Sequence, residues 1–446
     1  MRLSHDNIMF FDARGVAITA PHSEAVSLLD ATLLSYLAFK LDTGDRLKAA
    51  LASDPSLVMA PVLRGYFLLL LEKRELVPRA LDAATAADAA MAKYGATPRE
   101  RRHAEALRFW TQRDLSGARA ILTAILADEP RDLLALKLVQ YLLLYTGDWR
   151  AMRGAIETAL TAWDESMPGY GYVLGCHAFS LEECGDYAAA ERAGRRAVEL
   201  CPDDIWAGHA VAHVCEMQDR IDDGLRWLDQ ASGGWKDANN FAFHVVWHRC
   251  LFLLDIERND EVLALYDREV RPESTDDLLD ISNAVALLWR LEQLGTDVGR
   301  RWEELVGWSA KRCDDHMQVF GDVHYAMALA VAGDEDFARW HRSSETYGTK
   351  AETESEVMRD VGLALGDAAL AHRHGDYARA TERLLPLREG FHRIGGSHAQ
   401  RDLFTKLLID SAVRAGRSEI ARDLLRERLA ARPGNRWTKM MADRVR

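Results

Sequence analysis

The stretch from Gly171 to Pro202 constrains this chain most, because it has the pattern of two antiparallel helices joined by a tight turn. Gly185-Asp186-Tyr187 supplies the turn. Small residues follow on the face of the second helix that must approach the first closely, namely Ala190, Gly194 and Ala197. Pro202 ends the pair, since proline does not extend a helix beyond its first turn. A helix pair of about 34 residues cannot bury its apolar face alone, so it predicts stacked neighbours of the same kind.

Similar turns recur along the chain and predict a repeat fold. They are Gly147-Asp148-Trp149, Gly333-Asp334, Gly375-Asp376-Tyr377 and Ala415-Gly416-Arg417. We therefore expect an all-α, tetratricopeptide-like solenoid of roughly eleven or twelve helix pairs, wound into a superhelix. Residues 1–22 are expected to be a lead-in and 23–446 one continuous repeat domain, with the clearest repeats at 98–231 and 357–433. Ser232 to Trp235 is expected to be an inserted loop.

Some expected helices can be placed by their apolar periodicity. They span 23–40, 57–72, 77–94, 103–112, 133–145, 152–163, 241–256, 278–294 and 322–331. The repeat after Pro202 is expected to begin with a first helix at Ile205. Alternating strand patterns are missing, so essentially no sheet is expected.

Composition limits the classes of partner. The chain is 48% hydrophobic and 28% charged, with 56 basic and 69 acidic residues and a net charge of −13. This balance disfavours non-specific binding to nucleic acid or to an anionic membrane. No segment approaches the roughly 20 apolar residues that span a bilayer, and the N-terminus lacks an apolar signal-peptide core. The six cysteines form no C-x-x-C pair, so we expect reduced thiols in a cytoplasmic protein.

Several longer strings resemble the tetratricopeptide repeat protein 38 family. The most specific are Trp206 to Met217, which reads WAGHAVAHVCEM, and Gly395 to Asp402, which reads GGSHAQRD. Further matches are Gly175 to Glu183, His244 with His248, Leu288 to Glu292, and Asp322-Val323-His324. The resemblance extends over nearly the whole chain and implies an all-helical repeat fold. It implies no catalytic role for any residue.

Four polar or aromatic side chains share one face of the helix expected from Ile205. Small apolar residues occupy the positions where such a helix packs internally. The positions that usually face the concave groove are Trp206, His209, His213 and Glu216. His244 and His248 repeat the i, i+4 spacing on the next expected first helix. If both helices present these residues to the same groove, four histidines line it; otherwise His244 and His248 are an ordinary amphipathic pair.

Three interpretations of this histidine set remain open. Two imidazoles at i and i+4 with a carboxylate can chelate a divalent metal. The string is H-x-x-x-H-x-x-E, however, without the H-E-x-x-H order of a zinc hydrolase, so metal is expected at well under one equivalent. A second interpretation is a site for a small polar or anionic ligand or a peptide end. The third is a buried polar network that locks one helix to the next, which must be fully satisfied.

A second candidate region begins at Ser397. Ser397 and Gln400 predict a capping box at a helix start, and His398, Arg401 and Asp402 crowd the same turn. Free backbone N–H groups beside Arg401 would suit a carboxylate or phosphate. If the inner surface curves tightly, further residues of first helices join one shared site; the candidates are Asp322, His324, His398 and Arg401.

The leading functional prediction is a helical repeat protein that binds a small polar or anionic ligand, or a peptide end, in a histidine-rich groove. An enzyme that uses the same residues, with or without a metal, is the first alternative, and a protein-interaction scaffold is the second. No nucleophile elbow, phosphate-binding loop or dinucleotide fingerprint occurs, so catalytic residues are not assigned. No cofactor, nucleic acid or membrane partner is expected.

Overall fold

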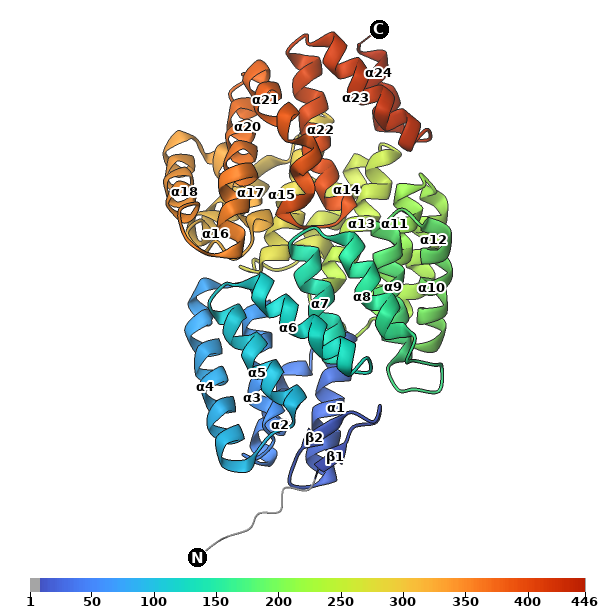
Figure 1. Cartoon of the computed structure of the whole chain (residues 1–446). Coiled ribbons are helices and arrows are strands. Elements are labelled where there is room, and N and C mark those ends of the chain that lie inside the picture. The colour runs from blue at the N-terminus through green and yellow to red at the C-terminus, as the bar shows by residue number, and fades with distance from the viewer. Residues whose placement is uncertain (1–8, 446) are drawn as a thin grey trace, which may run out of the picture. The chain divides into compact units, whose positions relative to one another are not determined.

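The computed structural model describes residues 9–445 and is mainly helical (Figure 1). A short antiparallel hairpin comes first, with Met9 opposite Thr19. It is formed by β1 (Met9–Phe11) and β2 (Ala17–Thr19). The helices up to the middle of the chain are α1 (Ser23–Leu37), α2 (Thr43–Ser53), α3 (Met59–Leu70), α4 (Val77–Tyr94), α5 (Pro98–Thr111), α6 (Leu115–Asp128), α7 (Leu133–Tyr145), α8 (Trp149–Leu160), α9 (Tyr170–Glu183), α10 (Tyr187–Leu200) and α11 (Ile205–Met217).

The second half continues in the same way. Its helices are α12 (Ile221–Ala231), α13 (Phe241–Asp255), α14 (Asn259–Leu265), α15 (Leu278–Gln293), α16 (Trp302–Arg312), α17 (Val319–Ala332), α18 (Asp334–Tyr347), α19 (Thr353–Val357), α20 (Leu363–Arg373), α21 (Tyr377–Leu384), α22 (His398–Arg414), α23 (Ser418–Ala431) and α24 (Arg436–Asp443). Short 3-10 and π-helical turns occupy 74–76, 232–234, 266–270, 299–301, 358–362 and 385–394. The predicted all-α helix-pair fold is confirmed.

Contacts divide the chain into two compact units. Within residues 9–445, unit 1 comprises the chain up to Leu144, Asp148–Ala210 and Ala231–Asn239, and unit 2 comprises Tyr145–Gly147, Val211–Gln230 and the chain from Asn240 onward. The boundary passes through α11. None of the helices among residues 9–445 is long and apolar enough to cross a membrane.

The turn between α9 and α10 shows why the helices pair. Gly185 adopts a φ of +80°, a conformation that other residues rarely take. The carboxylate of Asp186 then caps α10 by accepting a hydrogen bond from the N–H of Ala189. The buried residues of α10 are Ala190, Gly194 and Ala197, as predicted. Figure 1 shows α9 and α10 side by side in unit 1, where these small side chains let the backbones approach.

Unit 2 packs around large aromatic side chains. Trp247, Trp289 and Trp340 belong to one cluster that continues from α13 to α24. Full burial of a large apolar side chain contributes about 1.5–3 kcal/mol each. This core positions the first helices of the unit, which carry most of the candidate site residues.

Some predicted boundaries differ from the observed ones. The helix expected at 103–112 begins earlier, at Pro98, because Thr97 and Glu100 form a capping box and proline is favoured at the first helical position. The expected loop at Ser232 contains a 3-10 turn, Ser232–Gly234. The start of α11 at Ile205 and of α13 at Phe241 agree with the sequence. The single continuous domain remains a prediction.

Candidate functional site

Helix α11 carries four of the predicted site residues and is buried along almost its whole length. Every residue from Ile205 to Glu216 is buried. Apart from His209, His213 and Glu216, its sequence, IWAGHAVAHVCEM, is apolar or small, and a helix that is mainly apolar all round lies inside a core. The expected groove residues of α11 therefore lie in the protein interior and do not face an open groove.

Three histidines of unit 2 converge. His213 lies on α11, and His244 and His248 lie one turn apart on α13. One ring nitrogen from each lies within 4.8 Å of the others. The Nε2 atoms of His244 and His248 are 3.3 Å apart, and the ring centroids of His213 and His248 are separated by 4.4 Å. His209 precedes His213 by one turn on the same helix.

The other ring nitrogen of each α13 histidine has a hydrogen-bond partner. The Nδ1 atom of His244 lies 3.0 Å from Oδ1 of Asn283 on α15. An amide oxygen only accepts, so Nδ1 of His244 carries the proton. The Nδ1 atom of His248 lies 3.0 Å from Oε2 of Glu216 on α11. Asn283 and Glu216 thus fix the orientation of the two rings, with both Nε2 atoms turned toward each other.

Burial sets the charge state of this group. It lowers the pKa of His244 to about 3, and it holds the pKa of His248 well below its usual range. Burial also raises the pKa of the Glu216 carboxyl to about 7, against the opposing charge of Arg432. The two α13 histidines are therefore neutral at neutral pH. Since the proton of neutral His244 is on Nδ1, its Nε2 atom is an acceptor. Nε2–H of His248 therefore donates to Nε2 of His244. Nδ1 of His248 is then an acceptor, and a protonated Glu216 donates to it.

Trp206 and His209 belong to an aromatic cluster of unit 1. The ring of Trp206 lies 4.8 Å from that of Phe179 and 5.4 Å from that of His209, between centroids. The ammonium of Lys137 lies 3.8 Å from the centroid of Trp206 and donates a 3.0 Å hydrogen bond to Gln140. Burial lowers the pKa of this lysine. Trp206 therefore stabilises the buried ammonium of Lys137 through a cation–π interaction.

The remaining predicted residues have contacts of their own in unit 2. Asp322 pairs with His316 at 3.1 Å, and Nδ1 of His324 donates to the carbonyl of Phe320 at 2.7 Å. Arg401 donates to the carbonyl of Gly396. His398 opens α22, whose predicted capping box between Ser397 and Gln400 is confirmed. A single site shared by all of them remains a prediction.

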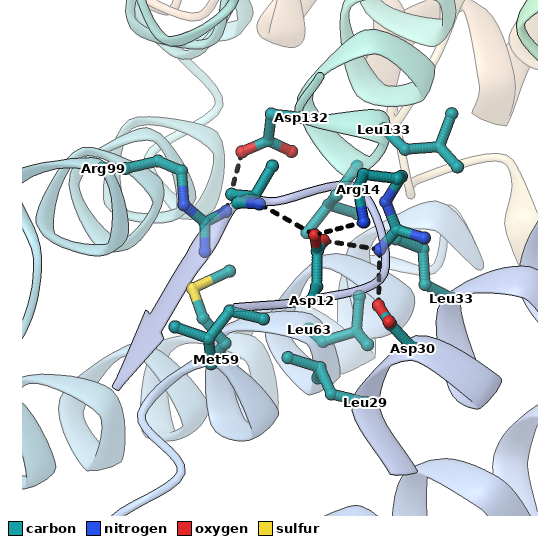
Figure 2. Close-up of a pocket in the computed structure, with 13 residues that line it drawn as sticks. Asp12, Arg14, Leu29, Asp30, Leu33, Met59, Leu63, Arg99, Asp132 and Leu133 are labelled. Atoms are coloured by element: carbon teal, nitrogen blue, oxygen red, sulfur yellow. Dashed lines mark hydrogen bonds and ion pairs between the residues drawn. The ribbon is translucent and has the colours of Figure 1, made fainter. Parts of the chain in front are cut away.

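A small cavity in unit 1 was not expected from the sequence (Figure 2). Arg14 pairs with Asp12 at 2.6 Å and with Asp30, and Arg99 pairs with Asp132 at 2.7 Å. The cavity measures about 30 Å³, which is room for about one water molecule. Each guanidinium already faces at least one carboxylate, so this polar centre braces the hairpin and α7 and offers little space for a ligand.

Sequence reasoning missed two classes of residue. Asn283 contacts the histidines only through the packing of α13 against α15, and no local signal marks it. Lys137 could have been found, because it interrupts the apolar run LLALKLVQYLLLY with one charge at a buried position. A charge there requires partners.

No family model matches the chain. Among solved structures, a complex of Naa15 and Naa10 bound to HypK-THB is similar, with 14% identity and a TM-score of 0.26. The alignment covers 90% of this chain and 68% of that chain. A likeness of this strength carries no argument about the function of this chain. Membership of the tetratricopeptide repeat protein 38 family remains a prediction.

Proposed function

We propose that this helical repeat protein binds one divalent transition-metal ion, such as Zn²⁺, through His213, His244 and His248. The observation that carries the proposal is the 3.3 Å separation of the Nε2 atoms of His244 and His248. In a tetrahedral site with metal–nitrogen bonds of about 2.0–2.1 Å, neighbouring ligand nitrogens lie about 3.3–3.4 Å apart. His213 supplies the third nitrogen after a small rotation of its side chain, since its ring nitrogen is within 4.8 Å of both.

The partners of the histidines support this proposal. Metal-binding histidines almost always donate their other N–H to a carboxylate or carbonyl oxygen, which fixes the ring and increases its basicity. Asn283 and Glu216 are placed for this at 3.0 Å from the Nδ1 atoms of His244 and His248. The neutral state of the two rings also suits a metal, because only an unprotonated nitrogen binds one.

The main alternative is a metal-free polar network that joins α11, α13 and α15. It uses the same hydrogen bonds but requires a protonated Glu216. With a cation bound, the requirement would be the reverse. Nε2 of His248 would have to be unprotonated and Nδ1 would carry the proton. Glu216 would be a carboxylate that accepts a hydrogen bond from Nδ1–H, and one proton would be lost to solvent. The metal proposal departs from the sequence analysis, which expected well under one equivalent of metal.

Metal titration of untagged protein tests the proposal. We expect one equivalent of Zn²⁺ or Co²⁺ to bind per chain and to raise the Tm, because a ligand that binds only the folded state stabilises it. Below pH 7, uptake should release about one proton from the Glu216–His248 pair, measured by calorimetry in two buffers of different ionisation enthalpy.

The matched variants are His248→Gln, which should abolish stoichiometric binding, and His374→Ala, which should leave it unchanged. His374 has a side chain that is 49% exposed and lies outside this group. Circular dichroism confirms that each variant is folded. Stoichiometric binding retained in His248→Gln, or a loss of Tm in this variant when the wild type binds no metal, would favour the network.

With these three histidines as its only protein ligands, a tetrahedral ion would keep one position for water or a ligand, as in catalytic zinc sites. The small polar or anionic ligand expected from the sequence would bind at this position. A metal-assisted enzyme is the second candidate function and rests on the same open position.

A further inference from the structure

Arg290, on α15 of unit 2, is a buried cation whose charge no residue of the described chain balances directly. Its side chain is in the interior, with 3% of the residue exposed. Nη1 donates to the carbonyl of Ala286 at 3.1 Å, and Nη2 donates to the carbonyl of Ala399 at 3.0 Å. Nε has no hydrogen-bond partner, and none of the carboxylates within residues 9–445 forms an ion pair with Arg290.

Two other arginines of unit 2 show the usual arrangement. Arg432 pairs with Asp219 at 2.8 Å, and Nη2 of Arg428 donates to Asp402 at 2.9 Å. A buried guanidinium without such a partner is costly. Burial accordingly lowers the pKa of Arg290, although Asp402 and Glu216 oppose the shift at longer range. An anion from outside the chain would balance this charge.

The histidine group lies next to Arg290. The guanidinium carbon is 5.4 Å from the ring centroid of Trp247. The same indole stacks on His244 at 5.4 Å and meets His248 edge-on at 4.9 Å, between centroids. Asn283 lies two turns before Arg290 on the same face of α15, and its Nδ2 atom also has no hydrogen-bond partner in the described part of the chain. Donors without acceptors thus lie on α15 beside the histidines.

We propose that the ligand of this site is a small oxyanion, a carboxylate or phosphate group, held by Arg290 and by the metal. This inference rests on the proposed metal site. The planar guanidinium of Arg290 would donate hydrogen bonds to the oxyanion, a geometry that arginine matches well, and a bound metal would supply one bond to an oxygen of the anion. The positive charge of a divalent metal and Arg290 together would exceed the single negative charge of a Glu216 carboxylate. An anionic ligand would balance the remaining positive charge in the interior.

Cobalt-substituted protein provides the test, because the visible bands of Co²⁺ report its ligands. Acetate and inorganic phosphate are titrated separately into the Co²⁺-loaded full chain, with sodium chloride as the control for ionic strength. We expect at least one of the two oxyanions to shift the bands in a saturable way. The variant Arg290→Met should keep the cobalt bands and weaken oxyanion binding at least tenfold.

Two further variants keep the test decisive. Arg290→Lys retains the charge but not the planar fork, and should weaken binding at least threefold even if Arg290→Met does not fold. Arg300→Met removes an exposed arginine and should have no effect, since its side chain is 88% exposed. Cobalt bands that neither anion shifts, or unchanged affinity in the Arg290 variants, overturn this inference and leave the metal site intact. Failure of the wild type to bind cobalt overturns both.

Discussion

At the scale of single residues, the chemistry of the site comes from neighbours that orient and neutralise the histidines. Asn283 fixes the proton of His244 on Nδ1, and Glu216 faces Nδ1 of His248. Burial sets the protonation state of each group, because it disfavours the charged form and shifts the pKa in favour of the neutral form. It lowers the pKa of both α13 histidines and raises that of Glu216 to about 7.

The pH dependence of stability follows from these shifts. Unfolded His244 titrates near its ordinary pKa of 6.5, but in the fold its pKa is about 3. Stability from the neutral ring is therefore complete above pH 6.5 and is lost as the pH falls toward 3. The lowered pKa of His248 acts in the same direction. Glu216 acts in the opposite direction, because its raised pKa favours the folded state as the pH falls from about 7 to 4.5.

Because its pKa is lowered in the fold, His244 should reduce the free energy of unfolding of the metal-free protein by on the order of 2 kcal/mol between pH 7 and pH 5. Urea unfolding at the two pH values should show this loss in the wild type and a smaller one in His244→Gln. The difference between the two proteins removes the contribution of other titrating groups. Equal losses in both would show that His244 is not held neutral in the fold.

At the scale of elements, the repeat depends on close contact between helices at small residues. Gly366 on α20 faces the indole of Trp340 on α18, and a Cβ added at Gly366 would lie 2.2 Å from that ring. Trp340 is fully buried and surrounded by the core of unit 2. The ring cannot move without displacing its neighbours, because protein interiors are close-packed.

Gly366→Ala should therefore destabilise the protein by about 1–3 kcal/mol through overpacking. The control is Gly307→Ala on α16, where an added Cβ meets nothing within 4 Å. That substitution should be neutral or stabilise the protein by up to about 1 kcal/mol, since alanine favours helix. Urea unfolding followed by circular dichroism measures both. A Gly366→Ala variant as stable as the control would mean that α18 and α20 do not pack this closely.

At the scale of the whole molecule, stability comes from helix packing and not from covalent cross-links. All six cysteines are free thiols in the structure, spread over both units. Burial raises the pKa of Cys176 to about 11 and that of Cys313 to about 12. These thiols are protonated at neutral pH and react slowly, because the thiolate is the reactive form.

Thiol titration checks this description. Denatured, non-reduced protein should give nearly six reactive thiols per chain, and native protein should react far more slowly. Two or more thiols missing after denaturation would indicate disulfides and contradict the structure. A reductant-treated sample serves as the control for adventitious oxidation.

The sequence by itself determined the local structure. Helical periodicity, the Gly-Asp turn at Gly185 and the capping box at Ser397 act over a few residues, so they could be read without a fold. The i, i+4 spacing likewise placed His244 and His248 on one face of α13. The residues in each of these interactions are close together in the sequence, so the interactions do not depend on the angles at which helices pack.

Only the tertiary structure decided what the histidines face. Glu216 meets His248 across 32 residues, and Asn283 meets His244 across 39. Such pairs depend on the angle and register at which α11, α13 and α15 pack, which no local pattern encodes. The same packing buries α11, whose polar residues the sequence had placed at a concave groove, and leaves Arg290 without an ion pair to any carboxylate of residues 9–445. Burial then set the charge of each group, because the free energy of a charge depends on its surroundings and not on its neighbours in sequence.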